Sequence, residues 1–467
     1  MPPTLVTTVV VLLGGAGCHL LAQDVPAARP PALLQAKPSE SVSGSAERFL
    51  NSEKAAAPKE QKLAGDTSAA EPRDLHAAGW VQLGDRLMQK ARESMESGLY
   101  ERARSAYHKA LDQDAKNEDA LVGLAWVNNT QHVFDEGRSW AEKALATNPK
   151  LSRAHALLGD AAVELGDYEE ALDHYQKALD IRPDLSSYSR SAHLVWLMGD
   201  ARKGRLLMEK AIKAGGPYAE NSAWCRAELA RMLWQDGALL PAEQQAELAL
   251  KQAPKNANVL ATLARIKTAN KQYDQAIELY QRAIEIIPTH DAFVALGDLF
   301  ALSHRPEEAM KQYNRVVDLH VSGAAHSHGS VGQLHSHGNA QLARFYADHD
   351  RNLDDALREA RLAYRDYKNV YVADTLAWCY YKKGHYEEAG KTIRKALRLN
   401  TPDPSILFHA GMIHSKLGDR GTAQKYLYRA LSLNPQFHPL DSAIAAETLK
   451  KLGERPTQDT QWNHVKP

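Results

Sequence analysis

The chain has 467 residues, and 57 Lys and Arg residues balance 57 Asp and Glu residues, so its formal net charge is zero. That balance argues against bulk electrostatic binding to nucleic acid or anionic lipid, which needs a basic excess. Hydrophobic residues make up 44% of the sequence and the mean hydropathy is −0.46, which excludes a protein with several membrane spans. Three cysteines are too few for a disulfide framework.

Residues 1–22 resemble a secretory signal peptide, because an apolar run (LVTTVVVLLGGA) lies near the start. Two processing sites compete: small residues before Cys18 form a loose lipobox that would make Cys18 a lipidation site, whereas Ala22 offers a signal-peptidase site. The run lacks its usual preceding basic residue, since the first is Arg29, and a hydrophobic start on a cytoplasmic protein is the alternative. We expect export to the periplasm, free or anchored to a membrane facing it, with secretion as an alternative.

Residues 23–78 are rich in Ala, Pro, Ser, Lys and Glu and show no sustained periodicity. Such a segment buries too little apolar surface to offset its chain entropy. We therefore expect a disordered tether here and a disordered tail at residues 456–467.

A repeat of about 34 residues follows the tether. The pattern Gly-x-Tyr-Glu-x-Ala occurs at Gly98 and again at Gly166. Proline often stands five residues after a recurring small residue, where a helix would end. These recurring residues are Ala110, Ala144, Ala178, Ala211, Ala249, Ala283, Val316, Ala363, Ala396 and Ala430.

Each repeat predicts two short helices, because Leu and Ala recur at i, i+3, i+4 and i+7. Small residues in mid-helix let the paired backbones approach closely, and tyrosines fill the space beside them (Tyr107, Tyr175, Tyr280 and Tyr313). No helix pair buries its apolar face alone, so neighbouring pairs must stack into a superhelix. The pattern, clearest from Leu158 to Pro183, resembles the tetratricopeptide repeat family.

The resemblance implies an all-α, right-handed solenoid of about ten helix-turn-helix repeats. Repeats 1–7 would occupy residues 80–320 and repeats 8–10 residues 340–437. A two-faced capping helix at residues 438–455 would close the open end.

The resemblance also implies that the first helix of each repeat lines a concave face, where core packing does not require large side chains. Aromatic and Arg side chains, the usual anchors of protein interfaces, stand at those positions. They predict a groove for an extended peptide or a partner helix, although packing on one another is the alternative. The Lys and Asn with which chaperone-binding members clamp a carboxylate are absent. The predicted groove residues are Trp126, Trp196, Trp224, Arg231, Trp234, Arg265, Tyr371, Trp378, Tyr381 and Phe408.

A His- and Gly-rich insertion, residues 321–339, separates repeats 7 and 8, and His-Ser-His-Gly occurs in it twice. Neutral imidazoles bind Zn, Cu or Ni, so His326, His328, His335 and His337 form a predicted metal site. A solvated loop is the alternative. No other cofactor is expected.

Cys225 and Cys379 fall in first helices four repeats apart, beyond disulfide reach, and we expect buried thiols. No phosphate loop, nucleophile elbow or zinc-protease motif occurs, and residues 348–350 (Asp-His-Asp) are interpreted as a polar turn. The sequence therefore predicts a non-catalytic scaffold that binds a protein or peptide in a larger extracytoplasmic complex. The alternative is a metal-binding or metal-delivery accessory protein.

Overall fold

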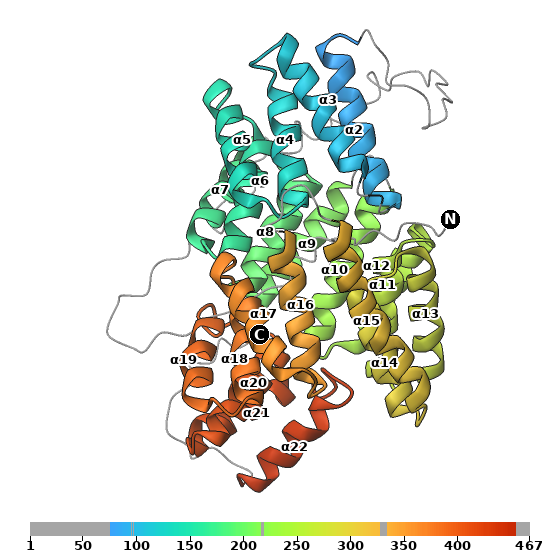
Figure 1. The fold of residues 1–467 in the computed structure, drawn as a ribbon, viewed down its shortest axis with the longest axis vertical. Helices are drawn as coiled ribbons and strands as arrows, with labels where there is room; N and C mark the ends of the chain where they lie inside the picture. The colour runs from blue at the N-terminus through green and yellow to red at the C-terminus, as the bar shows by residue number, and fades with distance from the viewer. Residues whose placement is uncertain (1–74, 95, 97, 216–218, 327–333, 454–467) are drawn as a thin grey trace.

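A computed structural model describes residues 75–94, 96, 98–215, 219–326 and 334–453. These residues form 21 helices and no strand, which confirms the predicted all-α solenoid (Figure 1). The predicted leader and tail lie outside the described residues, as do residues 23–74 of the predicted tether and the lipidation site predicted at Cys18. The predicted end of the tether at residue 78 is too late, because the first described helix already begins at Ala77. Among the described helices, none is both long and apolar enough to cross a membrane.

Each even-numbered helix packs most closely on the odd-numbered helix that follows it, so α2 to α21 form ten helix pairs in the described chain, and α22 follows the last pair. The first helices of the pairs are α2 (Ala77–Ser94), α4 (Glu118–Thr130), α6 (Ser152–Leu165), α8 (Leu185–Leu197), α10 (Ala219–Gln235), α12 (Ala257–Ala269), α14 (His290–Leu302), α16 (Leu334–Asp348), α18 (Val370–Lys382) and α20 (Pro404–Lys416). The second helices are α3 (Gly98–Gln113), α5 (Phe134–Thr147), α7 (Tyr168–Ile181), α9 (Ala201–Ala214), α11 (Leu239–Gln252), α13 (Tyr273–Ile286), α15 (Pro306–His326), α17 (Leu353–Asp366), α19 (Tyr386–Ala396) and α21 (Arg420–Leu433), and the chain then enters α22 (Asp441–Lys451).

Short polar side chains start many of the first helices. Asn117 accepts a hydrogen bond from the backbone N–H of Ala120 at 3.0 Å, and Asp403 accepts one from Ser405 at 2.9 Å. These bonds satisfy N–H groups that have no partner inside the helix. The same caps recur before α8, α12, α14 and α18, so polar caps mark where six of the ten pairs begin.

The recurring small residues lie in the core as predicted, and each of them is at most 1% exposed. A Gly-Asp step accompanies the tyrosines of three repeats. A Cβ atom on Gly159 would lie 2.3 Å from Cε1 of Tyr175, so only glycine leaves room for the ring. The Tyr175 hydroxyl donates at 2.7 Å to Oδ1 of Asp160, the residue that follows Gly159. The same arrangement joins Gly84, Asp85 and Tyr107, and Gly297, Asp298 and Tyr313.

The superhelix completes a turn and packs on itself, so that α17 to α21 lie beneath α5 to α7 (Figure 1). Loops inside repeats 2–5 meet the loops that precede α18, α20 and α22; we call this contact the inter-turn seam. At the seam, three glycines with positive φ lie so close to carbonyl oxygens of the next turn that a Cβ atom would stand 2.6–3.0 Å from them. The pairs are Gly166 with Lys368, Gly199 with Leu399, and Gly237 with Leu433.

Hydrogen bonds between distant repeats run along the inter-turn seam. The Tyr367 hydroxyl donates to the His132 carbonyl at 3.1 Å, and the Arg398 guanidinium donates to the Gly166 carbonyl at 2.7 Å. Further donors are the Asn369 amide to the Glu164 carbonyl, the Val370 N–H to the Tyr168 hydroxyl, the Thr401 hydroxyl to the Leu197 carbonyl, and the Asn434 amide to the Trp234 carbonyl. Most of them satisfy carbonyls that a helix end leaves open.

An apolar cluster closes one end of the inter-turn seam. Phe134 and Tyr367 meet edge to face with ring centroids 5.8 Å apart. Ala161, Ala340, Ala363 and Val372 complete the cluster, so α5 and α6 share a core with α16, α17 and α18. Burial of this shared surface favours contact between the two turns.

Candidate partner-binding surface

Half of the predicted groove residues lie in the interior of the protein. Trp196, Trp234 and Trp378 are 0%, 7% and 4% exposed, and Arg231 and Phe408 are buried too. The expectation that core packing does not require these positions is therefore wrong for these five. The other five are half-buried: Trp126, Trp224, Arg265, Tyr371 and Tyr381.

The Trp196 and Trp234 rings contact side chains of neighbouring repeats. The Arg231 guanidinium lies 5.7 Å from the Trp196 ring centroid, and the Arg265 guanidinium lies 5.4 Å from that of Trp234. The backbone beside both rings also lies at the inter-turn seam. Both stand at or next to the last residue of a first helix, where the next superhelical turn covers the helix end. The carbonyl of Trp234 and that of Leu197, the neighbour of Trp196, accept hydrogen bonds from that turn.

Polar side chains bridge the two turns on the inner face. Gln235 on α10 donates to the Asp403 carboxylate of the next turn at 3.1 Å. Within α10, Arg231 pairs with Glu228 at 2.6 Å. The Tyr371 hydroxyl lies 3.4 Å from the Asp403 carboxylate. Burial raises the pKa of Asp403, and nearby Asp374 raises this pKa further. The middle of the predicted groove is thus filled by the protein's own charged pairs.

The aromatic residues of repeats 9 and 10 stack on one another. The Trp378 ring stacks on the His409 ring with centroids 4.1 Å apart and on the Tyr381 ring with centroids 4.6 Å apart. Phe408 contacts the Trp378 ring at 5.8 Å. Only Tyr381 of this group keeps a half-exposed side chain.

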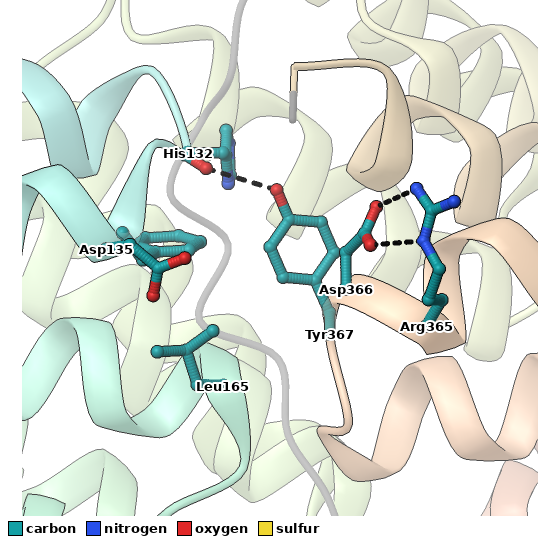
Figure 2. A pocket seen from close by; sticks show the side chains of 7 residues that line it. His132, Asp135, Leu165, Arg365, Asp366 and Tyr367 are labelled. Carbon is teal, nitrogen blue, oxygen red and sulfur yellow. Dashed lines mark hydrogen bonds and ion pairs between the residues drawn. The ribbon is translucent and has the colours of Figure 1, made fainter. Parts of the chain in front are cut away.

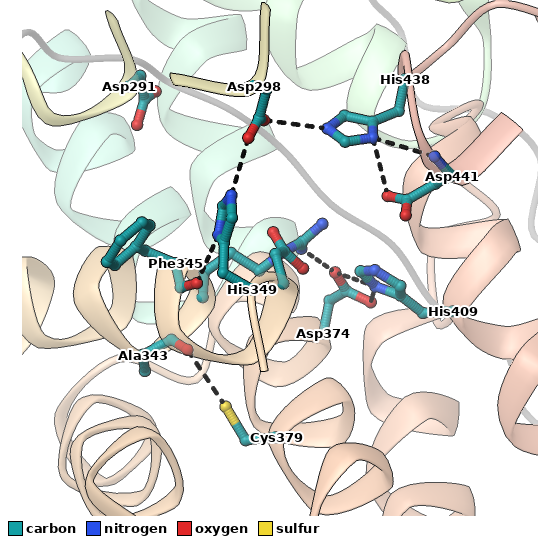
Figure 3. A network of polar contacts seen from close by, with 12 residues as sticks. Asp291, Asp298, Ala343, Phe345, His349, Asp374, Cys379, His409, His438 and Asp441 are labelled. Carbon is teal, nitrogen blue, oxygen red and sulfur yellow. Dashed lines mark hydrogen bonds and ion pairs between the residues drawn. The ribbon is translucent and has the colours of Figure 1, made fainter. Parts of the chain in front are cut away.

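A network of aspartates and histidines lies beside this stack (Figure 3). Asp298 on α14 accepts from the Tyr313 hydroxyl and from Nε2 of His349, each at 2.8 Å, and lies 3.7 Å from Nε2 of His438. His438 Nδ1 lies 3.1 Å from the Asp441 carboxylate. Asp348 ends α16, and His349 and Asp350 form a turn after it, in agreement with the polar turn predicted there. His349 also joins this turn to Asp298 on α14.

A second dyad extends the network. Asp374 on α18 lies 2.8 Å from Nδ1 of His409 on α20, and Arg344 on α16 donates to the same carboxylate at 2.9 Å. The Cys379 thiol donates toward the Ala343 carbonyl at 3.7 Å, and burial raises its pKa. Both Cys225 and Cys379 are free and buried, as predicted.

The aspartates and histidines of the network stabilise one another's charged forms. The histidines hold the pKa of Asp298 well below its usual range against the opposing effect of burial. Asp441 and Asp298 raise the pKa of His438 to about 9, again against burial. These contacts tie α14, α16 and the start of α22 together, and they were missed from the sequence because Asp298 and His438 lie more than a hundred positions apart.

A small cavity of ≈ 270 Å³ lies at the end of the inter-turn seam (Figure 2). Phe134, Leu165 and Tyr367 give it apolar walls, and Asp135, Arg365 and Asp366 give it charged ones. Arg365 pairs with Asp366 at 2.7 Å, so its charge is already neutralised. This volume is below the range typical of small-molecule sites.

The four histidines of the predicted metal site, His326, His328, His335 and His337, have side chains outside the described part of the chain. Within the described residues, no group of three or more His, Cys, Asp or Glu side chains is placed to hold a metal ion. Zn, Cu or Ni binding by the insertion stays a prediction.

Comparisons with known proteins agree with the observed repeat. Family models described as tetratricopeptide repeat match residues 94–161, 152–185, 256–320 and 373–437. The human protein O-mannosyl-transferase TMTC1 is 25% identical over 219 residues, which are 45% of this chain and 22% of that protein, so the chain spans less than a quarter of this curated relative. A thermophilic TPR protein of Thermus thermophilus, TTC0263, is 21% identical over 41% of this chain and 99% of that one, with a TM-score of 0.37. Human IFIT1 is 15% identical over 84% of this chain and 88% of that one, with a TM-score of 0.44.

Proposed function

The chain belongs to the tetratricopeptide repeat family, whose members are protein–protein interaction scaffolds, and on that premise we propose that it binds a protein or peptide segment outside the cytoplasm without catalysing a reaction. The segment lies on the part of the inner face that the inter-turn seam leaves open. The proposal is supported chiefly by the half-buried aromatic and Arg side chains that remain there.

Trp224 and Arg265 are central to this surface. Trp224 lies near the start of α10, away from the covered end where Trp234 is buried, and is half-buried. The Arg265 guanidinium on the next first helix lies 5.4 Å from the Trp234 ring centroid and is half-buried as well. Trp224 offers an apolar contact and Arg265 a cation, which suits a partner with an apolar anchor and a carboxylate. Trp126 and Tyr381 extend the half-buried set toward either end.

The charge distribution of the chain favours specific contacts with a partner over non-specific electrostatic binding. The formal net charge is zero, and the inner-face charges are largely paired with each other. A partner therefore gains little from long-range attraction and must fit the aromatic side chains. This agrees with a peptide or helix as ligand rather than nucleic acid.

The surface can be tested by crosslinking in the native host followed by affinity measurements. The full chain captures its partner in cells, mass spectrometry identifies the partner, and the purified pair gives a Kd. Trp224→Ala should weaken binding by about 2 kcal/mol, or roughly 30-fold, as for an interface anchor. Leu206→Ala, at an exposed site on the outer helix α9, should leave the Kd unchanged. Equal Kd values for the parent and Trp224→Ala would contradict the proposal.

Export is a separate component of the proposal and has its own test. If Cys18 carries a lipid, Cys18→Ala should move the protein from the membrane fraction to the soluble fraction. If cleavage follows Ala22 instead, the mature chain should begin at Gln23. An unmodified N-terminus beginning at Met1 would reject both processing routes and with them the extracytoplasmic location.

A further inference from the structure

The small cavity at the end of the inter-turn seam lies between segments that are far apart in the sequence (Figure 2). Phe134 and Asp135 begin α5, and Leu165 ends α6. Asp366 ends α17, and Tyr367 follows it. The cavity therefore lies where the first superhelical turn meets the second. Its volume of ≈ 270 Å³ is the share of about nine water molecules, which is room for one long side chain.

The apolar walls of the cavity are rigid and well packed. The Phe134 and Tyr367 side chains are buried and meet edge to face, with ring centroids 5.8 Å apart. Leu165 adds an aliphatic surface. A methylene chain would gain hydrophobic contact with these walls, and a cation at its end could lie against an aromatic ring.

Carboxylates outnumber cations around these rings. Asp135, Asp366 and Arg365 line the cavity, which leaves one net negative charge. The Arg365 side chain is 67% exposed and that of Asp366 only 19%, so the guanidinium of this pair lies on the solvent side. Burial raises the pKa of Tyr367, and the carboxylates of Glu164, Asp366 and Asp135 raise this pKa further. The same carboxylates would stabilise a cation in the cavity.

We propose that a Lys or Arg side chain from residues 23–74 of this chain binds in the cavity. Its methylene groups pack on Phe134, Leu165 and Tyr367, and its charged end reaches Asp135, which is exposed at the rim. A hydrated inorganic cation would gain nothing from the apolar walls, and an uncharged side chain would gain nothing from the carboxylates. Lys and Arg combine both properties.

The small size of the site favours the protein's own N-terminal segment over a separate partner. A cavity that takes one side chain gives a Kd of about 1 mM, too weak to capture a separate protein. An attached segment has an effective concentration of about 1 mM, which suffices. It joins the described chain at Leu75, and a residue twenty positions earlier can lie up to about 66 Å away. The basic residues of the segment are Arg29, Lys37, Arg48, Lys54, Lys59, Lys62 and Arg73.

The bound side chain adds a contact between the two superhelical turns. It touches α5 and α6 of the first turn and the end of α17 in the second, beside the apolar cluster that these helices already share. None of the lining residues belongs to the helices that carry Trp224 and Arg265. The proposal is therefore independent of the partner-binding surface proposed above.

Carboxylate labelling of the folded full chain tests this docking. A water-soluble carbodiimide and glycine ethyl ester modify accessible carboxylates, and mass spectrometry of the peptides gives the rate at Asp135. The comparison chain carries Gln at the seven basic positions of residues 23–74, so the segment keeps its length without its cations. With about half of the molecules docked, Asp135 should react at least about twofold more slowly in the parent chain.

Asp274 is the matched control for this experiment. It is the second residue of α13, as Asp135 is of α5, and it is exposed but does not line the cavity. Its labelling rate should be the same in both chains. Circular dichroism checks that the two chains fold alike.

Dilution distinguishes docking within one chain from binding by a second copy. Intramolecular docking does not depend on protein concentration, so the protection of Asp135 should persist on about a hundredfold dilution. Loss of protection on dilution would assign the cation to a second copy and overturn the proposal. Equal rates at Asp135 in the parent and comparison chains would overturn it as well, whether both rates are fast or slow.

Discussion

The side-chain amide of Asn434 donates a hydrogen bond to the backbone carbonyl of Trp234 at 2.7 Å, across 200 positions of sequence. Asn434 follows the last repeat, and Trp234 stands near the end of a first helix in the fifth. The bond therefore marks the point where the second superhelical turn meets the first.

Gly237→Ala should loosen the inter-turn seam. Its φ is +71°, and a Cβ atom would lie 2.6 Å from the Leu433 carbonyl oxygen, so the loops must separate. Gly384→Ala is the matched control, because Gly384 has φ +79° but nothing within 4 Å of the added atom. Both variants lose about 1 kcal/mol to backbone strain, and only Gly237→Ala should lose about 1–3 kcal/mol more. Urea unfolding and the hydrodynamic radius measure the difference, and equal losses would show that the seam contributes nothing.

Trp196→Ala should destabilise the protein far more than Trp126→Ala. The Trp196 side chain is 0% exposed within the largest core cluster, and its removal leaves a cavity worth about 3–5 kcal/mol. Trp126 is half-buried, so we expect a loss of about 1–2 kcal/mol there. Thermal unfolding of the two purified variants gives the comparison. Similar unfolding temperatures would contradict the burial of the Trp196 ring in the core.

Gly159→Ala should overpack a helix pair. The added methyl group would stand 2.3 Å from the Tyr175 ring, and we expect a loss of about 1–3 kcal/mol in the free energy of unfolding. Gly421→Ala on α21 has open space around it, so the same substitution should be neutral or stabilise by up to about 1 kcal/mol. Opposite signs in denaturant unfolding support close packing at Gly159. A stabilised Gly159→Ala variant would refute it.

The closure of α22 on α14 should weaken at alkaline pH. Carboxylates of Asp441, Asp298 and Asp348 raise the pKa of His438 to about 9 from an unfolded value near 6.5. A raised folded-state pKa contributes stability that is fully present below pH about 6.5 and is lost as the pH rises through about 9. Because the side chain is 32% exposed, we expect a loss of about 1–2 kcal/mol rather than the full linkage value.

Urea unfolding at pH 6.5 and pH 9.5, followed by tryptophan fluorescence, measures this loss in the parent chain. His438→Gln keeps a hydrogen-bonding side chain but cannot titrate, so its stability should fall less between the two pH values. The other titrating groups are common to both chains and cancel in the comparison. An identical pH dependence of parent and variant would remove His438 from the linkage.

The repeat architecture was predictable because its signals are local. Alanines such as Ala144 and Ala178 recur at a fixed spacing, and the packing they permit involves only helices within the same repeat or its neighbour. The inter-turn seam carries no such signal. Gly166 and Gly384 occupy the same turn of their repeats with similar backbone conformations, yet only Gly166 meets a carbonyl of another turn.

The aspartate–histidine network was not predictable for a related reason. Asp298 and His349 lie in repeats 7 and 8, His438 follows repeat 10, and each residue alone suits an ordinary polar position. The curvature of the superhelix brings His438 to the other two, and curvature depends on small rotations accumulated over many repeats. The groove residues could be named from the sequence but not sorted into buried and half-buried, because burial depends on how the side chains of neighbouring repeats pack.

Because its two superhelical turns are in contact, the molecule should resist stretching differently from an open solenoid. A solenoid whose turns do not touch lengthens under small forces, whereas one whose turns are in contact stays rigid until those contacts break. Here the two turns meet at Gly166, Gly199 and Gly237, and hydrogen bonds of the inter-turn seam join them. Pulled along its axis, this protein should resist extension up to a threshold and then yield abruptly. A partner that pulls on the chain ends would therefore have to separate the two turns before the solenoid could extend.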